Sequence, residues 1–179
     1  PADDATRAYF AVQLEQRVDM VYEGEAIDPR MHHHLTLEVD AYGRTRLEAD
    51  VAYPRRAGLA TMPAQANARC EVERARLVHR DSPDAFEIGI PIEEETFELL
   101  GAAVTQAGPF TPDTLRNALA PLLAAPLPHD DIGPWHGPAL RRTDWERNYY
   151  WDATLTAASV LGVVPAEALL HHEESAAYS

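Results

Sequence analysis

The chain has 179 residues, of which 29 are acidic and 15 basic, and its formal net charge is −14. This acidic balance excludes a general nucleic-acid binder, which needs positive charge to displace counterions. No apolar run approaches the roughly 20 residues that cross a bilayer, so we expect no direct membrane insertion. The single cysteine, Cys70, excludes an intramolecular disulfide framework and a cysteine-built zinc site.

Three regions of different character divide the chain. Residues 1–100 predict a sheet of β-hairpins, 101–138 a helix followed by a Pro-rich linker, and 139–179 an aromatic-rich tail. The predicted fold class is mainly β with minor α, in which antiparallel hairpins form a sheet strip and one short helix lies near 112–123. The sequence opens without an initiator Met, so we interpret 1–179 as a single β-rich segment excised from a larger chain.

The clearest local prediction is a hairpin. Apolar and polar residues alternate along 33–40 and again along 47–53, which is the period of a half-buried strand. Between the two runs, Asp40-Ala41-Tyr42-Gly43 has turn chemistry, and we expect Gly43 to adopt a positive φ. Pro54 should end the second strand, because proline cannot donate to a ladder.

Other segments follow the same logic with weaker patterns. The further candidate strands are 16–23, 70–79 and 86–92, and 93–100 could extend the last of them. The composition of 57–67 predicts a loop. Pro91 indicates that its strand lies at an edge or contains a bulge.

A helix start follows in the middle of the chain. Thr111 is the expected N-cap, Pro112 the first helical residue, and Asp113 a favourable charge in the first turn. Leucines then recur at helical spacing, and Pro121 should shorten or kink the helix. In the tail, the spacing permits either strand or helix, and 166–170 suggests a helical turn.

An aromatic cluster borders on arginines in that tail. The residues that we consider for partner binding are Arg141, Arg142, Trp145, Arg147, Tyr149 and Trp151. Packing within a sheet is the alternative interpretation of the aromatic side chains.

The histidines are the candidate metal ligands of the sequence. His32 and His34 point the same way on a strand, but a third ligand must come from elsewhere, with Asp28 and Glu38 as nearby acids. Polar strand residues are the favoured interpretation. The His171-His172-Glu173-Glu174 run lacks the spacing of a metalloprotease helix. The acidic loop around His129 lacks the EF-hand pattern. We predict no metal and no cofactor.

Catalytic candidates are equally weak. Glu93, Glu94, Glu95 and Glu98 could pair as glycosidase carboxylates, but a solvated strand end is the commoner arrangement. Cys70 has no base partner in the sequence and is expected to be a half-buried structural thiol. No phosphate loop or nucleophile elbow is present. We therefore predict no catalytic residue.

Charge is unevenly placed along the chain. Residues 44–80 hold eight Arg and four acids, whereas the rest of the sequence is strongly acidic. This basic strip either pairs with acidic neighbouring strands or docks on an acidic partner.

A further set of residues forms an ordered series of motifs: Asp28, Pro29, Arg30, His34, Glu38, Asp40, Gly43, Tyr53, Arg55 and Arg56. This order resembles the B component of bacterial insecticidal toxin complexes, in its middle/C-terminal region before the Rhs/YD repeats. The resemblance is strongest over 20–56 and extends more weakly over 16–174.

The resemblance implies a structural role. In this family, the B and C components form a hollow β-shell around a toxic payload, and a propeller docks the shell on the pore-forming A component. The segment would contribute to the shell or to its junction with the propeller, within a secreted or extracellular toxin complex. Its partners would be the parent chain and the C and A components, and exposed strand edges suggest a homodimer. The alternative function is a free-standing acidic β-rich module that binds a glycan or a protein.

Overall fold

The structure is a computed structural model of the chain. The residues that it describes are 12–22, 27–56, 58–60, 62–83, 85–101, 109–134, 136–166 and 169–177.

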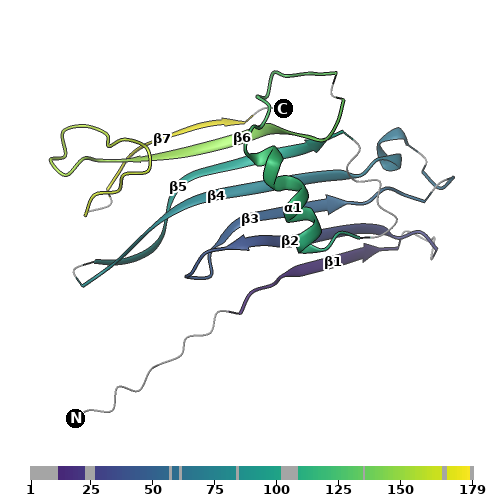
Figure 1. Cartoon of the computed structure of the whole chain (residues 1–179), viewed down its shortest axis with the longest axis horizontal. Helices are drawn as coiled ribbons and strands as arrows, with labels where there is room; N and C mark the ends of the chain where they lie inside the picture. The colour runs from purple at the N-terminus through teal and green to yellow at the C-terminus, as the bar shows by residue number, and fades with distance from the viewer. Residues whose placement is uncertain are drawn as a thin grey trace, which may run out of the picture.

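Within these ranges, seven strands form one antiparallel sheet in which each strand pairs with the next along the chain (Figure 1). The strands are β1 (Gln16–Val21), β2 (Arg30–Val39), β3 (Thr45–Ala52), β4 (Arg69–Ser82), β5 (Ala85–Leu100), β6 (Ala139–Tyr150) and β7 (Leu170–Ala177). The predicted fold class, mainly β with one short helix, is confirmed.

The predicted hairpin is formed by β2 and β3. Gly43 in the turn between them has a φ of 75°, as its turn position required. β3 ends two residues before Pro54. The loop predicted for 57–67 contains one short 3₁₀ turn, Pro63–Ala66.

Helix α1 (Pro112–Leu123) begins where its capping signal predicts. The backbone N–H of Thr114 donates to the hydroxyl of Thr111 at 3.3 Å, which satisfies one of the free donors of the first turn. The helix continues for only two residues beyond Pro121, consistent with the predicted shortening. No helix among the described residues is long and apolar enough to cross a membrane.

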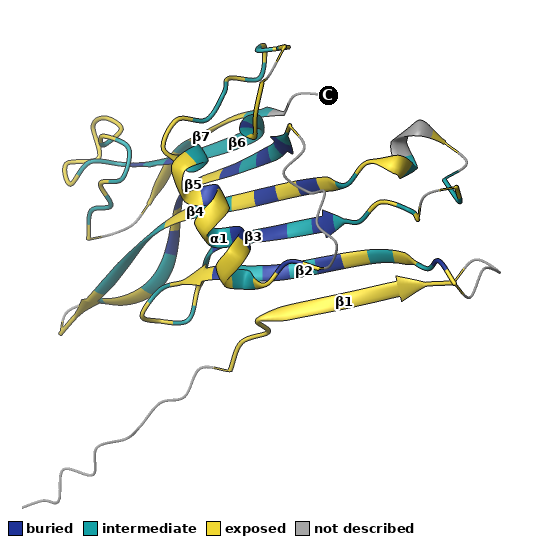
Figure 2. Cartoon of the chain, turned by 45° about the vertical axis from the view of Figure 1, so that its right-hand side comes forward, coloured by how far each residue is buried: buried dark blue, intermediate teal, exposed yellow. Residues whose placement is uncertain are grey.

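One face of the sheet carries the core. α1 crosses this face and contacts both β2 and β6 (Figures 1 and 2). Leu115 and Leu119, one helical turn apart, are fully buried against the sheet. The residues beneath them are Leu35, Leu37, Leu47, Ala49, Val51, Cys70, Val72, Phe97, Leu99 and Leu140. Burying each leucine stabilises the fold by about 2 kcal/mol.

A bulge lies in β5 next to Pro91. Arg76 of β4 opposes Glu93 whereas Leu77 opposes Pro91, so Ile92 is the extra residue. The bulge alternative for Pro91 is therefore confirmed. The ladder between β5 and β6 begins only at Glu93, so in the described pairings Pro91 has a partner strand on one side alone. A bulge shifts the alternation of side chains, and Ile92 and Glu93, although consecutive, are both buried.

A second, smaller cluster occupies the far end of the sheet. Ile90 and Ile92 of β5 pack with Tyr150 of β6, and Leu161 and Val164 of the β6–β7 connection cover them. The apolar segment 155–164 is therefore a loop that shields this end of the sheet, whereas α1 shields the other (Figure 1).

The aromatic tail, which the sequence left open between helix and strand, forms β6 and β7. The helical turn expected for 166–170 is wrong at its end, because Leu170 begins β7. Residues 167 and 168 lie outside the described residues. Pairing with β5 decides the outcome for β6, since a ladder satisfies backbone groups that a short isolated helix leaves open.

Candidate functional site

Several motif residues form a clamp at the end of the first hairpin. Asp28 accepts a hydrogen bond from Nε of Arg55 at 2.6 Å and another from the backbone N–H of Arg56 at 3.1 Å. The hydrogen bond from Arg55 lowers the pKa of Asp28 and outweighs the opposing effect of burial. The clamp fixes the entry to β2, which Pro29 precedes and Arg30 begins, against the segment that follows β3.

Tyr53 connects the sheet to the start of the helix. Its hydroxyl accepts from the backbone N–H of Phe110 at 2.8 Å and lies 3.1 Å from Nδ1 of His33. Nε2 of His33 donates to the side-chain oxygen of Gln16 at 3.3 Å, so in the neutral ring Nδ1 accepts a hydrogen bond from the Tyr53 hydroxyl. Burial lowers the pKa of His33 and favours this neutral form.

Sequence reasoning assigned no structural role to His33 and considered only its neighbours, His32 and His34. It is 1% exposed. Its burial could have been predicted from its position two residues before Leu35, because alternate residues of a strand share a face.

Asp40 organises the turn between β2 and β3. Its carboxylate accepts from the backbone N–H groups of Tyr42 and Arg44, both at 2.9 Å, and lies 2.7 Å from Nε2 of His79. Nδ1 of His79 accepts the N–H of Gly89 at 3.0 Å, so Nε2 carries the proton. Burial opposes ionisation of Asp40, but these donors hold its pKa below the usual value.

His34 and Glu38 lie on the same strand but serve no common site. His34 pairs through Nδ1 with Asp50 at 3.3 Å, and His32 lies 3.8 Å from the same carboxylate. Glu38 is exposed at an irregularity of the β2–β3 ladder. Within the described ranges, no group of three His, Cys, Asp or Glu residues is arranged to hold a metal.

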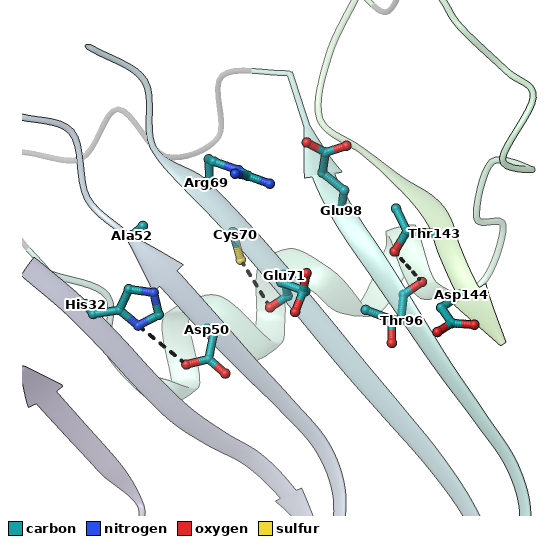
Figure 3. A pocket seen from close by; sticks show the side chains of 10 residues that line it. All are labelled: His32, Asp50, Ala52, Arg69, Cys70, Glu71, Thr96, Glu98, Thr143 and Asp144. Atoms are coloured by element: carbon teal, nitrogen blue, oxygen red, sulfur yellow. Dashed lines mark hydrogen bonds and ion pairs between the residues drawn. The ribbon is translucent and has the colours of Figure 1, made fainter. Parts of the chain in front are cut away.

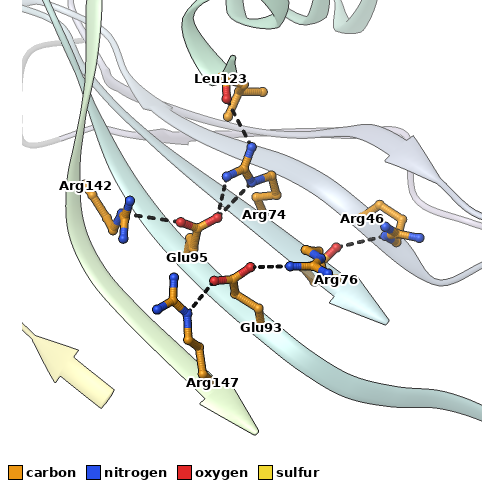
Figure 4. A network of polar contacts seen from close by, with 9 residues as sticks. Arg46, Arg74, Arg76, Glu93, Glu95, Leu123, Arg142 and Arg147 are labelled. Atoms are coloured by element: carbon orange, nitrogen blue, oxygen red, sulfur yellow. Dashed lines mark hydrogen bonds and ion pairs between the residues drawn. The ribbon is translucent and has the colours of Figure 1, made fainter. Parts of the chain in front are cut away.

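Two glutamates of β5 are buried among arginines on the helix-covered face (Figure 4). Glu95, 5% exposed, accepts from both Nε and Nη2 of Arg74 and lies 3.3 Å from Nε of Arg142. Arg74 also donates to the carbonyl of Leu123 at 3.2 Å. It therefore connects the sheet to the last turn of α1.

Glu93 forms the second half of this network. It accepts from Arg76 at 2.9 Å and from Arg147 at 2.7 Å. Burial raises the pKa of Glu93, but the two guanidinium groups more than offset it and hold the value below normal. Each glutamate thus lies between an arginine of β4 and one of β6.

This network corrects one expectation from the sequence and explains another. The prediction of a solvated acidic strand end is wrong for Glu93 and Glu95, which are buried. Arg74 and Arg76 belong to the basic strip 44–80, so part of that strip pairs with the neighbouring strand. Because its two arginine partners hold the pKa of Glu93 below normal, Glu93 does not suit the role of a general acid.

The residues considered for partner binding do not form one surface. The register of β6 with β5 and β7 shows which of them share a face. The four on the face of Glu93 and Glu95 are Arg142, Trp145, Arg147 and Tyr149. Arg141 points to the opposite face, where it donates to Glu98 at 2.7 Å. Trp151 lies beyond the end of β6, bridged to Ala158.

Trp145 is a partly exposed aromatic residue of β6. Arg147 stacks on its ring at 4.8 Å from the centroid. Trp145 and Arg142 line a hollow of about 360 Å³ together with Pro128, His129 and Asp130 of the linker. This hollow is small and partly charged.

The face of the sheet opposite α1 is uncovered by any described element and is strongly acidic. Its carboxylates are Glu48, Asp50, Glu71, Glu73, Glu94, Glu98, Asp144 and Glu146. A groove of about 860 Å³ lies on this face, with His32, Asp50, Glu71, Glu98 and Asp144 among its lining residues (Figure 3).

Several of these carboxylates oppose one another directly. The like-charged pairs are Glu48 with Glu73, Asp50 with Glu71, Glu71 with Glu98, and Glu94 with Glu146. Like charges directly opposite in a ladder are destabilising. Burial and neighbouring carboxylates accordingly raise the pKa of Glu73.

Cys70 is more buried than expected. Its side chain is 1% exposed in the main core, so the expected half-buried position is wrong. Burial raises the pKa of its thiol to about 12. The reactive thiolate is therefore suppressed, as in a structural cysteine.

The part of the chain that holds the motif contacts matches a known protein family. Residues 1–83 match the family model described as the insecticide toxin TcdB middle/C-terminal region. The resemblance is confirmed. The TcdB-like stretch includes β1 to β4, and with them the Asp28 clamp and the Asp40 turn. No curated protein matches the sequence.

Two solved structures share the fold. The crystal structure of TcdB2-TccC3-Cdc42 matches with a TM-score of 0.59 and 19% identity, over 83% of this chain and 7% of that chain. The crystal structure of TcdB2-TccC3 without the hypervariable C-terminal region matches with a TM-score of 0.61 and 18% identity, over 89% of this chain and 8% of that chain. The chain thus spans less than a tenth of the length of these chains.

Proposed function

We propose that this chain is a non-enzymatic structural segment of a toxin-complex B component. It contributes to the β-shell that encloses a toxic payload, or to the junction of that shell with the propeller. Its partners are the rest of the parent chain, the C component and, through the propeller, the pore-forming A component. The assembly acts as a secreted virulence factor outside the bacterial cell.

The observation that carries this proposal is an open sheet in which TcdB-like motif residues lie at turns and at the starts of elements. Asp28, Asp40 and Tyr53 each bind backbone N–H groups that fix a turn or an element start. Residues in such roles hold a scaffold together and need no substrate. An antiparallel sheet with free edges extends naturally into a larger wall.

The test is to place the segment within the assembled complex. The protein encoded by the complete reading frame is purified with a co-expressed C component and imaged by single-particle electron microscopy. The proposal is supported if residues 16–177 lie in the shell wall or at its junction with the propeller. It is overturned if the reading frame is short and stops after Ser179, or if the segment lies outside both regions.

A second candidate function is a glycan- or protein-binding module. The hollow beside Trp145 favours it, because an aromatic face with an adjacent arginine suits a sugar or a peptide. Titration of the chain with a glycan panel, followed by Trp fluorescence, tests this function. Binding that Trp145→Ala abolishes would support it, and no response to any glycan would leave the scaffold role as the better account.

A further inference from the structure

β1 is the least protected part of the sheet. All six of its residues are exposed, although the strand pairs with β2 along its whole length (Figure 2). None of the described strands lies on its outer side. It contains no proline, and its ladder with β2 has no bulge. The edge therefore lacks a proline or a bulge that would hinder pairing, and its two charged side chains, Arg17 and Asp19, are of opposite sign.

The direction of the free backbone groups follows from the β1–β2 ladder. The N–H of Thr36 donates to the carbonyl of Glu15 at 2.9 Å, so that pair is a hydrogen-bonded one. Hydrogen-bonded pairs alternate along an antiparallel ladder, so Arg17 and Asp19 also direct their backbone groups towards β2. Gln16, Val18 and Met20 consequently present their N–H and C=O groups to the open edge.

The side chains of β1 are complementary to themselves. Arg17 and Asp19 flank Val18 and point to the same face, where their exposed side chains form an ion pair at 2.9 Å. If a second β1 aligns antiparallel about Val18, each Arg17 lies opposite the other strand's Asp19. These two positions form non-hydrogen-bonded pairs, in which side chains approach most closely.

We propose that β1 binds a second copy of this chain through a two-fold antiparallel pairing centred on Val18. Val18 then pairs with its own copy, Gln16 pairs with Met20 of the copy, and two Arg17–Asp19 ion pairs flank the centre. A two-fold pairing can be centred on Gln16, Val18 or Met20, the residues whose backbone groups face the open edge. The pairing centred on Val18 places the largest number of β1 residues opposite residues of the second β1. Val18 and Met20, 40% and 52% exposed, extend the apolar face of the joined sheets.

The opposite edge of the sheet is less suited to this contact. Glu173 and Glu174 are consecutive exposed residues of β7, and an irregularity interrupts its ladder with β6 beyond Tyr149. Self-pairing of β7 would bring acidic side chains together, which is unfavourable. The proposal rests on the open edge of the proposed function: in the isolated chain, a second copy takes the place on β1 that a neighbouring strand of the wall would take in the parent protein.

Charge reversal tests the register. The oligomeric state of the chain is measured by sedimentation velocity from about 5 to 500 μM, the range in which small interfaces dissociate. Arg17→Asp and Asp19→Arg each convert two attractions into two repulsions, and each should weaken the dimer by about tenfold or more. When the two variants are mixed, opposite charges face each other again, and a heterodimer should form with about the wild-type affinity.

Matched controls separate this contact from general charge effects. Asp130→Arg makes the same charge change in an exposed loop and should leave the dimer unchanged. Glu174→Arg makes a similar change on β7 and should also have no effect. Circular dichroism checks that each variant is folded, and heterodimer formation by the mixture confirms it independently.

The outcomes are decisive for the register. A wild-type chain that stays monomeric, a mixture that does not associate, or a dimer that responds to Glu174→Arg instead would overturn the proposal. None of these results would affect the scaffold role, which is tested in the assembled complex and not in the isolated chain.

Discussion

Two neighbouring glutamates of β5 should respond in opposite ways to the same substitution. Glu95→Gln removes the charge between Arg74 and Arg142 on the covered face, and leaves both guanidinium groups without their shared counter-ion. Breaking a buried ion pair costs about 3–5 kcal/mol, and the side chains of these arginines retain about 30% exposure. We therefore expect a loss of about 2–3 kcal/mol.

Glu94→Gln is the matched control one residue away. Glu94 lies on the opposite face, directly across from Glu146. Its substitution removes a like-charge repulsion, so stability should stay the same or rise by up to about 1 kcal/mol.

Urea denaturation followed by circular dichroism measures both changes. With a slope of about 2 kcal/mol per molar, the midpoint of Glu95→Gln should fall by roughly 1–1.5 M while that of Glu94→Gln does not fall. Equal losses for the two variants would refute the assignment of their faces. A Glu95→Gln protein as stable as the wild type would refute the role of the ion network.

Three other substitutions test separate parts of the structure. Gly43→Val forces a β-branched residue to a φ of 75° and should lower Tm by roughly 3–8 °C, so an unchanged Tm would contradict the turn geometry. Tyr53→Phe leaves the N–H of Phe110 and Nδ1 of His33 without their partner and should cost about 1–3 kcal/mol by urea denaturation, whereas no loss would contradict the shared hydrogen bonds. Because the pKa of Glu73 is raised in the fold, the native state binds its proton more tightly than the unfolded chain, and stability falls as pH rises through that pKa. Glu73→Gln should therefore raise Tm at pH 7 and leave it unchanged at about pH 3.5, and equal effects at both pH values would contradict the assignment.

Much of the local structure could be predicted because it depends on neighbours in sequence. The period-two pattern of 33–53 identifies two strands and their exposed and buried sides, and Gly43 identifies the turn. The helix start at Thr111 is equally local, because its hydroxyl binds an N–H three residues away. The motif order was enough to identify the TcdB-like resemblance.

Contacts between distant segments were beyond such reasoning. Alternation predicts that Glu93 and Glu95 share a face opposite Glu94, but it cannot say which face a helix will cover. Glu93 and Glu95 keep the alternation of Phe97 and Leu99, which pack in the core beneath α1, so the position of the helix decides that their face is the covered one.

The sequence by itself therefore determined the strands, the main turn, the helix start and the family resemblance, since each depends on residues a few positions apart. Only the tertiary structure decided that Cys70 and Glu95 are buried, that the aromatic tail pairs as strands, and that β1 forms an open edge. The physical reason is that burial and pairing depend on register across the sheet, where partners lie tens of residues apart in the chain.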